Sequence, residues 1–150
     1  MIVAHQPLAS ALAASGAHVY TCAPERAGTA VRALDVAPGA ELDATLAQAR
    51  ALVAAVDDGH GVLVLTDAFG ATPGNVATRL AEAGRVAVIA GVNLPMLLRA
   101  LCYRDGTLAE TVDKALAGGT QGIVQVAARA MQNQSVRAQG HGDARLHHQQ

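Results

Sequence analysis

Residues 62–67 read Val-Leu-Val-Leu-Thr-Asp, a continuous apolar run that ends in two polar side chains. Such a run is expected for a strand that is covered on both faces, as in a parallel sheet. A loop with Gly70 follows, and then Thr72 and Pro73, which suit the N-cap and the first position of a helix. This helix is expected to continue until Gly84. The stretch therefore predicts a strand–loop–helix unit of an α/β protein.

Strand-like and helix-like patterns alternate along the rest of the chain. Apolar runs of strand length occur at residues 1–4, 29–36, 62–65, 86–90 and 122–126. Apolar residues at helical spacing follow the first four runs, and the last helical pattern is expected to end at Gly118 and Gly119. This order predicts a doubly wound, mainly parallel sheet flanked by helices, with residues 122–126 as a final short strand.

Length and composition indicate the domain organisation. A chain of 150 residues suits one domain with a substantial core. We expect residues 1–127 to form that domain. Residues 128–150 are rich in Gln, His and Gly and lack hydrophobic periodicity, so they are expected to form a disordered polar tail.

The charges and the apolar runs argue against several classes of partner. The chain has 11 Lys and Arg against 12 Asp and Glu, and no basic stripe is interleaved with aromatic residues, so nucleic acid is not an expected partner. No apolar run reaches the length of a membrane span, which argues against direct membrane insertion. Cys22 and Cys102 have neither C-x-x-C nor disulfide spacing, which predicts reduced side chains and a cytoplasmic protein.

His5 stands where the first apolar run gives way to a helical pattern that opens at Leu8. Open α/β sheets place their ligands at such turns, at the carboxyl ends of parallel strands. Asp67 follows another strand, so it is expected at the same edge, where its carboxylate would fix the tautomer of the imidazole. His5 would then be a nucleophile. The pattern alone leaves open that Asp67 only ends its strand or caps a turn.

The loop after Asp67 adds an expected anion site. Gly70, Ala71 and Thr72 lie just ahead of a helix N-terminus, where backbone N–H groups favour a phosphoryl group. With His5 these residues describe a phosphohistidine site, which needs no cofactor. P-loop, dinucleotide-binding and nucleophile-elbow motifs are absent from the sequence, and no companion ligands at fixed spacing predict a metal site.

Three segments carry a resemblance to a known family. They read Ile-Val-Ala-His at residues 2–5 with Pro-Leu at 7–8, Leu-Thr-Asp-Ala-Phe-Gly-Ala-Thr-Pro-Gly-Asn at 65–75, and Ile-Ala-Gly-Val-Asn-Leu-Pro-Met-Leu at 89–97. In their order and spacing over residues 1–127, the chain resembles the enzyme IIA domain of the mannose/fructose family. These domains belong to the bacterial phosphoenolpyruvate-dependent sugar phosphotransferase system.

The resemblance implies a phosphocarrier. His5 would accept a phosphoryl group from the phosphohistidine of the carrier protein HPr and pass it to an enzyme IIB component, for sugar uptake or regulation. Asp67 would hold the imidazole, and the backbone of residues 70–72 would cradle the phosphoryl group. No cofactor is implied.

The resemblance also implies partners of two kinds. Members of the family usually form homodimers in which a carboxyl-terminal strand joins the sheet of the other subunit, and residues 122–126 would be that strand. From their placement near His5, we expect Phe69, Pro73 and Met96 to form the docking surface for the phosphoryl donor and acceptor.

Two alternatives share this fold. The first is the phosphoryl-donor subunit of a dihydroxyacetone kinase complex, although the motifs at residues 67–75 and 91–95 favour the sugar system. The second is a non-catalytic regulatory module. Its support is Gln6, which stands where the family usually has glycine after the histidine. The strand ahead of His5 is also shorter than is usual in the family, which is consistent with a truncated start.

Overall fold

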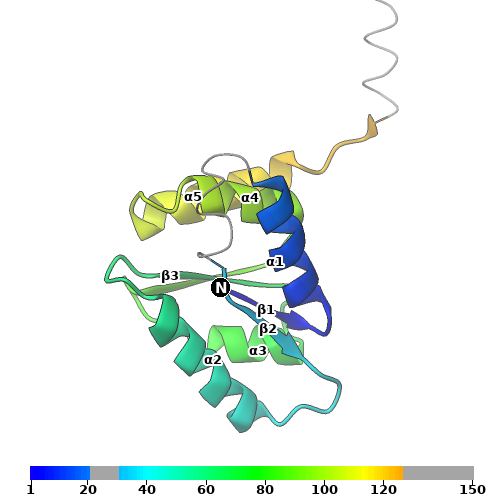
Figure 1. The fold of residues 1–150 in the computed structure, drawn as a ribbon, viewed down its shortest axis with the longest axis vertical. Coiled ribbons are helices and arrows are strands. Elements are labelled where there is room, and N and C mark those ends of the chain that lie inside the picture. The colour runs from blue at the N-terminus through cyan, green and yellow to red at the C-terminus, as the bar shows by residue number, and fades with distance from the viewer. Residues whose placement is uncertain (21–30, 127–150) are drawn as a thin grey trace, which may run out of the picture.

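The protein is described here by a computed structural model, which covers residues 1–20 and 31–126 (Figure 1). Strands and helices alternate along most of this part of the chain. The strands are β1 (Ile2–His5), β2 (Ala33–Val36), β3 (Val62–Thr66) and β4 (Val86–Ala90). The helices are α1 (Leu8–Val19), α2 (Leu42–Val56), α3 (Thr72–Thr78), α4 (Leu94–Cys102) and α5 (Leu108–Gln121).

The four strands form one sheet in the order β2-β1-β3-β4, and each neighbouring pair is parallel. In the register of the sheet, Ile2 lies opposite both Ala33 and Leu65. Because β1 and β3 are adjacent and parallel, the residues that follow His5 and Thr66 emerge at the same edge. The predicted α/β fold with a parallel sheet is confirmed.

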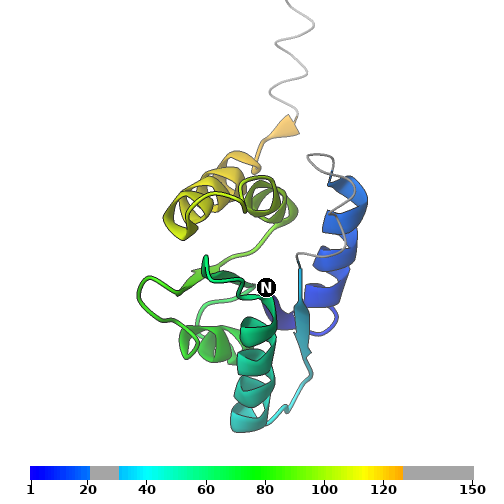
Figure 2. The same ribbon diagram turned by 60° about the vertical axis from the view of Figure 1, so that its left-hand side comes forward.

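Helices cover both faces of the sheet (Figures 1 and 2). On one face, Val3 and Val64 belong to a buried cluster with side chains of α2 and α3, such as Val53 and Val76. On the other face, Ile2, Leu65 and Ile89 belong to a cluster with side chains of α1, α4 and α5. Successive residues of β3 therefore enter opposite cores, which explains why its sequence is apolar without alternation.

Helix α3 differs at both ends from the prediction. Ala71 occupies the N-cap and Thr72 is the first helical residue, so the prediction of Thr72 as N-cap was wrong. The helix ends at Thr78 and does not continue to Gly84. The backbone of Glu82 forms two hydrogen bonds with that of Val86. These bonds close a turn before β4, and residues in this turn cannot continue the helix.

Helix α5 runs through the two glycines that were expected to end it. A side chain at Gly118 would overlap Arg99 of α4, and one at Gly119 would come within 2.6 Å of Cε of Met96. Both glycines are buried. They allow the close approach of α4 and α5 and do not break the helix.

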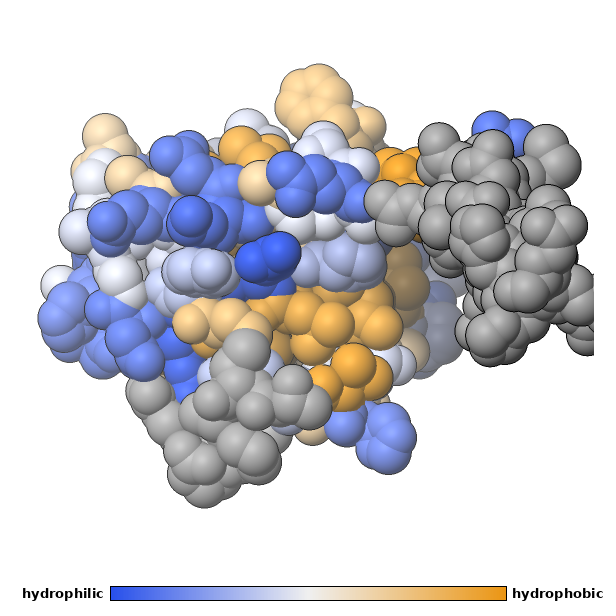
Figure 3. Space-filling view, turned by 90° about the horizontal axis from the view of Figure 1, so that it is seen from above, coloured by the Kyte–Doolittle hydropathy of each residue, from blue (hydrophilic) through white to orange (hydrophobic). Residues whose placement is uncertain are grey.

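Residues 122–126 form no strand within the described chain, contrary to the prediction for this segment. Their side chains are instead exposed, with Ile123 at 78% and Val126 at 73% of full exposure. The view onto the α4–α5 side of the molecule shows apolar side chains gathered in a band on this face (Figure 3). Strand exchange between subunits stays a prediction.

Other predictions fall outside the described residues or are corrected. The predicted tail, residues 128–150, lies outside them, as do residues 29–30 of the expected second strand. Cys102 is disulfide-bonded, so the prediction of a reduced side chain was wrong there.

Among the helices of residues 1–20 and 31–126, none is both long enough and apolar enough to cross a membrane.

The α4–α5 contact gives a prediction of stability. We expect Gly118→Ala to lower the free energy of unfolding by about 1–3 kcal/mol, because the added methyl group overlaps Arg99 and approaches the Pro95 carbonyl oxygen. Asp113→Ala, on an exposed position of the same helix, should change it by about 0.5 kcal/mol or less. Urea denaturation of both variants tests this, and equal effects would contradict the packing role of Gly118.

Candidate functional site

The structure brings His5 and Asp67 together at the carboxyl edge of the sheet. His5 ends β1, and Asp67 directly follows β3. Oδ2 of Asp67 accepts the backbone N–H of His5 at 2.9 Å and lies 2.7 Å from Nδ1 of the imidazole. A single carboxylate oxygen therefore holds both the main chain and the ring of the histidine.

Asp67 is itself held in place from two directions. Its other oxygen, Oδ1, accepts the backbone N–H of Ala68 at 2.8 Å. Its backbone carbonyl accepts the N–H of Gly91, and that of Thr66 accepts the N–H of Val92, both at 3.0 Å. The loop after β4 therefore braces the loop after β3, so the carboxylate that contacts His5 has a defined position.

The electrostatics favour an ionised Asp67. Burial raises the pKa of Asp67, but hydrogen bonds from the backbone and ring of His5 and from the Ala68 N–H together outweigh it, so the pKa lies below its ordinary value. An ionised carboxylate is an acceptor only, so the proton between it and the ring belongs to Nδ1 of His5. In the neutral form of the ring, the lone pair is then on Nε2.

The imidazole of His5 is open to an incoming group. Its side chain is 54% exposed, whereas that of Asp67 is 13% exposed. Nε2 makes no hydrogen bond to any residue in the described part of the chain. The arrangement gives an oriented, accessible nitrogen nucleophile with an anion behind it.

The predicted phosphoryl-binding residues lie in the loop between Asp67 and α3. Gly70 and Thr72 are exposed, and Ala71 is half-buried at the N-cap of α3, where it offers no side-chain acceptor. Gly74 fixes this loop against the helix, because a Cβ there would overlap the carbonyl oxygen of Ala68. The amide of Asn75 donates to the Gly70 carbonyl at 3.4 Å.

Of the three residues predicted to dock partners, one is on the surface. Phe69 is 85% exposed, which is unusual for a large apolar side chain. Pro73 is fully buried and Met96 is 5% exposed, so neither side chain is available to a partner. Helical position explains the error: Pro73 lies on the buried side of the first turn of α3, and Met96 packs against Gly119 of α5.

Two polar residues near this edge were missed by the sequence analysis. Asn93 caps α4 by accepting the Met96 N–H at 2.9 Å and donates to the Gly119 carbonyl at 3.1 Å. Asp35 in β2 accepts the backbone N–H of Ser10 at 3.1 Å. The position of Asn93 just before the Leu-Pro start of a helix could have indicated its capping role. The contact of Asp35 with Ser10 has no such local signal, because it joins segments that are distant in sequence.

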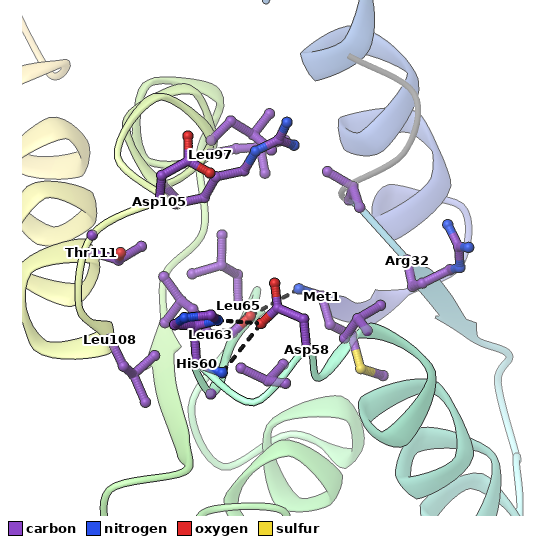
Figure 4. A pocket seen from close by; sticks show the side chains of 18 of the residues that line it. Met1, Arg32, Asp58, His60, Leu63, Leu65, Leu97, Asp105, Leu108 and Thr111 are labelled. Carbon is purple, nitrogen blue, oxygen red and sulfur yellow. Dashed lines mark hydrogen bonds and ion pairs between the residues drawn. The ribbon is translucent and has the colours of Figure 1, made fainter. Parts of the chain in front are cut away.

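A cavity of about 320 Å³ lies at the other edge of the sheet, where the strands begin (Figure 4). Met1, Leu63 and Leu97 are among the residues that line it. His60 and Asp58 also line it, with Nδ1 of His60 3.2 Å from Oδ1 of Asp58.

In the part of the chain that the structure describes, no group of three or more His, Cys, Asp or Glu side chains could hold a metal ion.

Comparison with known proteins assigns the chain to a family. A family model described as EIIA-man, PTS system fructose IIA component, matches residues 1–116, where PTS is the sugar phosphotransferase system. The chain belongs to the EIIA-man family. His5 and Asp67, with the loop to Thr72, all lie within the matched residues.

Similar proteins extend the comparison. The mannose-specific EIIAB component of the PTS from Escherichia coli (strain K12) is 33% identical over 102 residues, which are 66% of this chain and 32% of that protein. The fructose-specific EIIA component from Bacillus subtilis (strain 168) is 47% identical over 51 residues, 33% of this chain and 35% of that protein. The matches to these curated relatives therefore span about a third of their length.

Solved structures share the fold of this EIIA-man chain. The phosphotransferase system component EIIA from Streptococcus agalactiae is 28% identical, with a TM-score of 0.69 over 85% of this chain and 95% of that chain. The PTS IIA protein associated with the fucose utilization operon of Streptococcus pneumoniae has a TM-score of 0.70 over 86% of this chain and 93% of that chain. At 21% identity, this structural similarity shows a common fold alone.

The low pKa of Asp67 makes the site sensitive to acid. A carboxyl whose pKa is lowered by folding stabilises the protein above its ordinary pKa, about 4, and this contribution is lost as the pH falls through the folded value. Asp67→Asn is therefore expected to reduce the free energy of unfolding most near neutral pH, and the difference should shrink in acid.

Urea denaturation of the native chain and of Asp67→Asn across this pH range measures the difference. Asp113→Asn removes an exposed carboxylate of α5 that does not contact His5, and it reports the effect of one negative charge alone. A deficit for Asp67→Asn that stays constant from neutral pH into acid would contradict the assignment.

Proposed function

We propose that this EIIA protein is a phosphocarrier in which Nε2 of His5 accepts a phosphoryl group from phospho-HPr and passes it to an enzyme IIB component. The observation that carries the proposal is the double contact of Asp67 with the backbone and the Nδ1 of His5, which leaves Nε2 exposed. Family membership supports the same reaction. The relatives named for mannose and fructose suggest a sugar of that kind as the transported substrate.

The proposed chemistry is an in-line displacement at phosphorus. The lone pair of Nε2 attacks the phosphoryl group while the phosphorus–nitrogen bond of the donor phosphohistidine breaks, and its electron pair stays on the donor ring. No proton has to move on His5, because Nδ1 already carries one. The product ring is cationic, and the carboxylate of Asp67, 2.7 Å from Nδ1, stabilises that charge. Transfer to the enzyme IIB component reverses these steps.

The loop after Asp67 would bind the phosphoryl oxygens. The backbone N–H groups of Gly70, Ala71 and Thr72 precede or open α3, whose first turn has no side-chain cap. Helix α3 packs against β1, the strand that ends at His5. Positioning and charge stabilisation are the main demands of phosphoryl transfer, and this loop would supply both without a cofactor.

We also propose that the protein is a homodimer that uses its α4–α5 side. A groove there is lined by Pro95, Leu98 and Tyr103 of α4 and its end. It adjoins residues 122–126, whose apolar side chains are exposed. Covering this surface with a second copy would remove apolar area from water, and residues 122–126 are the segment that would be exchanged.

Phosphorylation by purified components tests the carrier function. Incubated with phosphoenolpyruvate, enzyme I and HPr, the native chain is expected to take up an acid-labile, base-stable label, and His5→Ala should take up none. His60→Ala is the matched control, because His60 also pairs with a carboxylate but lies at the opposite edge of the sheet. An unlabelled native chain, or label that survives His5→Ala, would overturn the proposal.

The exposed phenyl ring gives a second prediction. Phe69→Ala should raise the KM for phospho-HPr about tenfold with little change in kcat, because an exposed aromatic side chain in the loop that carries Asp67 is typical of a binding hot spot. Leu116→Ala, which truncates an exposed side chain of α5, should leave both constants unchanged. Steady-state phosphorylation rates at varied HPr concentration measure both, and a change confined to kcat would argue against docking through Phe69.

A further inference from the structure

The turn that follows His5 is held from β2 as well as from β3. Asp35 lies opposite Ala4 in the pairing of β2 with β1, one position before the partner of His5. Its Oδ1 accepts the backbone N–H of Ser10, in the first turn of α1, at 3.1 Å. A carboxylate of an edge strand therefore reaches the helix that starts directly after the candidate nucleophile.

Helix α1 has no cap within its own sequence. Its N-cap residue is Pro7, which has no side-chain acceptor, and no acidic residue stands in its first turn. The first N–H groups of a helix need acceptors from outside the helix, and negative charge is favourable there. Asp35 supplies this acceptor from a residue 25 positions along the chain from Ser10.

Further hydrogen bonds connect this cap to the histidine. The backbone N–H of Gln6 donates to the carbonyl of Val36 in β2 at 3.1 Å. The hydroxyl of Ser10 donates to the carbonyl of Pro7, also at 3.1 Å. The two residues that link His5 to α1, Gln6 and Pro7, are therefore held by hydrogen bonds to β2 and to Ser10, while Asp67 holds His5 itself from the β3 side.

We propose that Asp35 is a positioning residue for His5. By accepting the Ser10 N–H, Asp35 caps α1 and fixes the turn at Gln6 and Pro7. This turn sets the direction in which Nε2 of His5 points, while Asp67 contacts Nδ1. The consequence for phosphoryl transfer rests on the proposed function. The effect on the ring does not, because the orientation of the imidazole is a property of the protein without any partner.

The expected effects separate rate from binding. Asp35→Ala should lower the rate constant for phosphorylation of His5 about tenfold while the KM for phospho-HPr stays unchanged, since a small misplacement of a reacting group slows the transfer step. Asp35→Asn should retain the native rate constant, because its amide oxygen still accepts the Ser10 N–H. In ¹⁵N spectra of the His5 ring, Asp35→Ala should reduce the population with the proton on Nδ1, and Asp35→Asn should not.

The matched control is another helix cap. Thr107 caps α5 by accepting the Glu110 N–H at 3.2 Å, and its removal in Thr107→Ala costs a comparable interaction away from His5. Thr107→Ala should therefore leave the phosphorylation rate and the ring spectrum unchanged. An equal loss of rate in Asp35→Ala and Thr107→Ala would show a general effect of stability and overturn the proposal.

The remaining outcomes are also decisive. A native rate constant and ring spectrum in Asp35→Ala would overturn the positioning role. Should Asp35→Ala fail to fold, the Asp35→Asn ring spectrum decides, and a disturbed spectrum there overturns the proposal. A native chain that takes no label contradicts the carrier function alone, because the ring spectra of the variants still report the role of Asp35.

Discussion

The contact between Oδ2 of Asp67 and the two nitrogens of His5 is the interaction on which the site depends. It exists because β1 and β3 are adjacent and parallel, so the residues that leave them share an edge. Had the two strands been separated by a third, the carboxylate and the imidazole would lie about 10 Å apart, twice the spacing of neighbouring strands. The strand order β2-β1-β3-β4 is therefore as much a part of the site as the two side chains.

The packing of the helices keeps this edge rigid. The loop after β4 donates hydrogen bonds to Thr66 and Asp67, and that loop continues into α4 through the cap at Asn93. Asn93 in turn donates to Gly119 of α5, which can approach because it has no side chain. A chain of contacts thus runs from the glycines of α5 to the carboxylate that orients the histidine.

The two faces of the site have different characters. Behind the imidazole lie the half-buried carboxylate of Asp67 and its backbone hydrogen bonds, whose geometry cannot change without cost to the fold. On the open side, the imidazole of His5 is exposed, and so is the ring of Phe69, two residues after Asp67 in the adjoining loop. This division suits the proposed carrier function, in which the nucleophile has to keep its orientation while successive partners approach and leave.

The sequence by itself determined most of the local units and the family. The apolar run of residues 62–65 indicates a strand buried on both faces, and the position of His5 at the end of the first run predicts a ligand-binding turn. These conclusions follow from patterns of neighbouring residues, which depend on short-range physics. The motifs at residues 65–75 and 89–97 identified the family, which the comparison confirmed.

Only the tertiary structure decided which groups touch. Gly118 and Gly119 looked like a helix end because glycine is a poor helix former, but their role is to admit α4, a contact that no local pattern encodes. Pro73 and Met96 looked like surface residues because they follow a site loop, yet the helices turn them inward. The reach of Asp35 to Ser10 depends on strand register and helix placement, which arise from the packing of the whole chain.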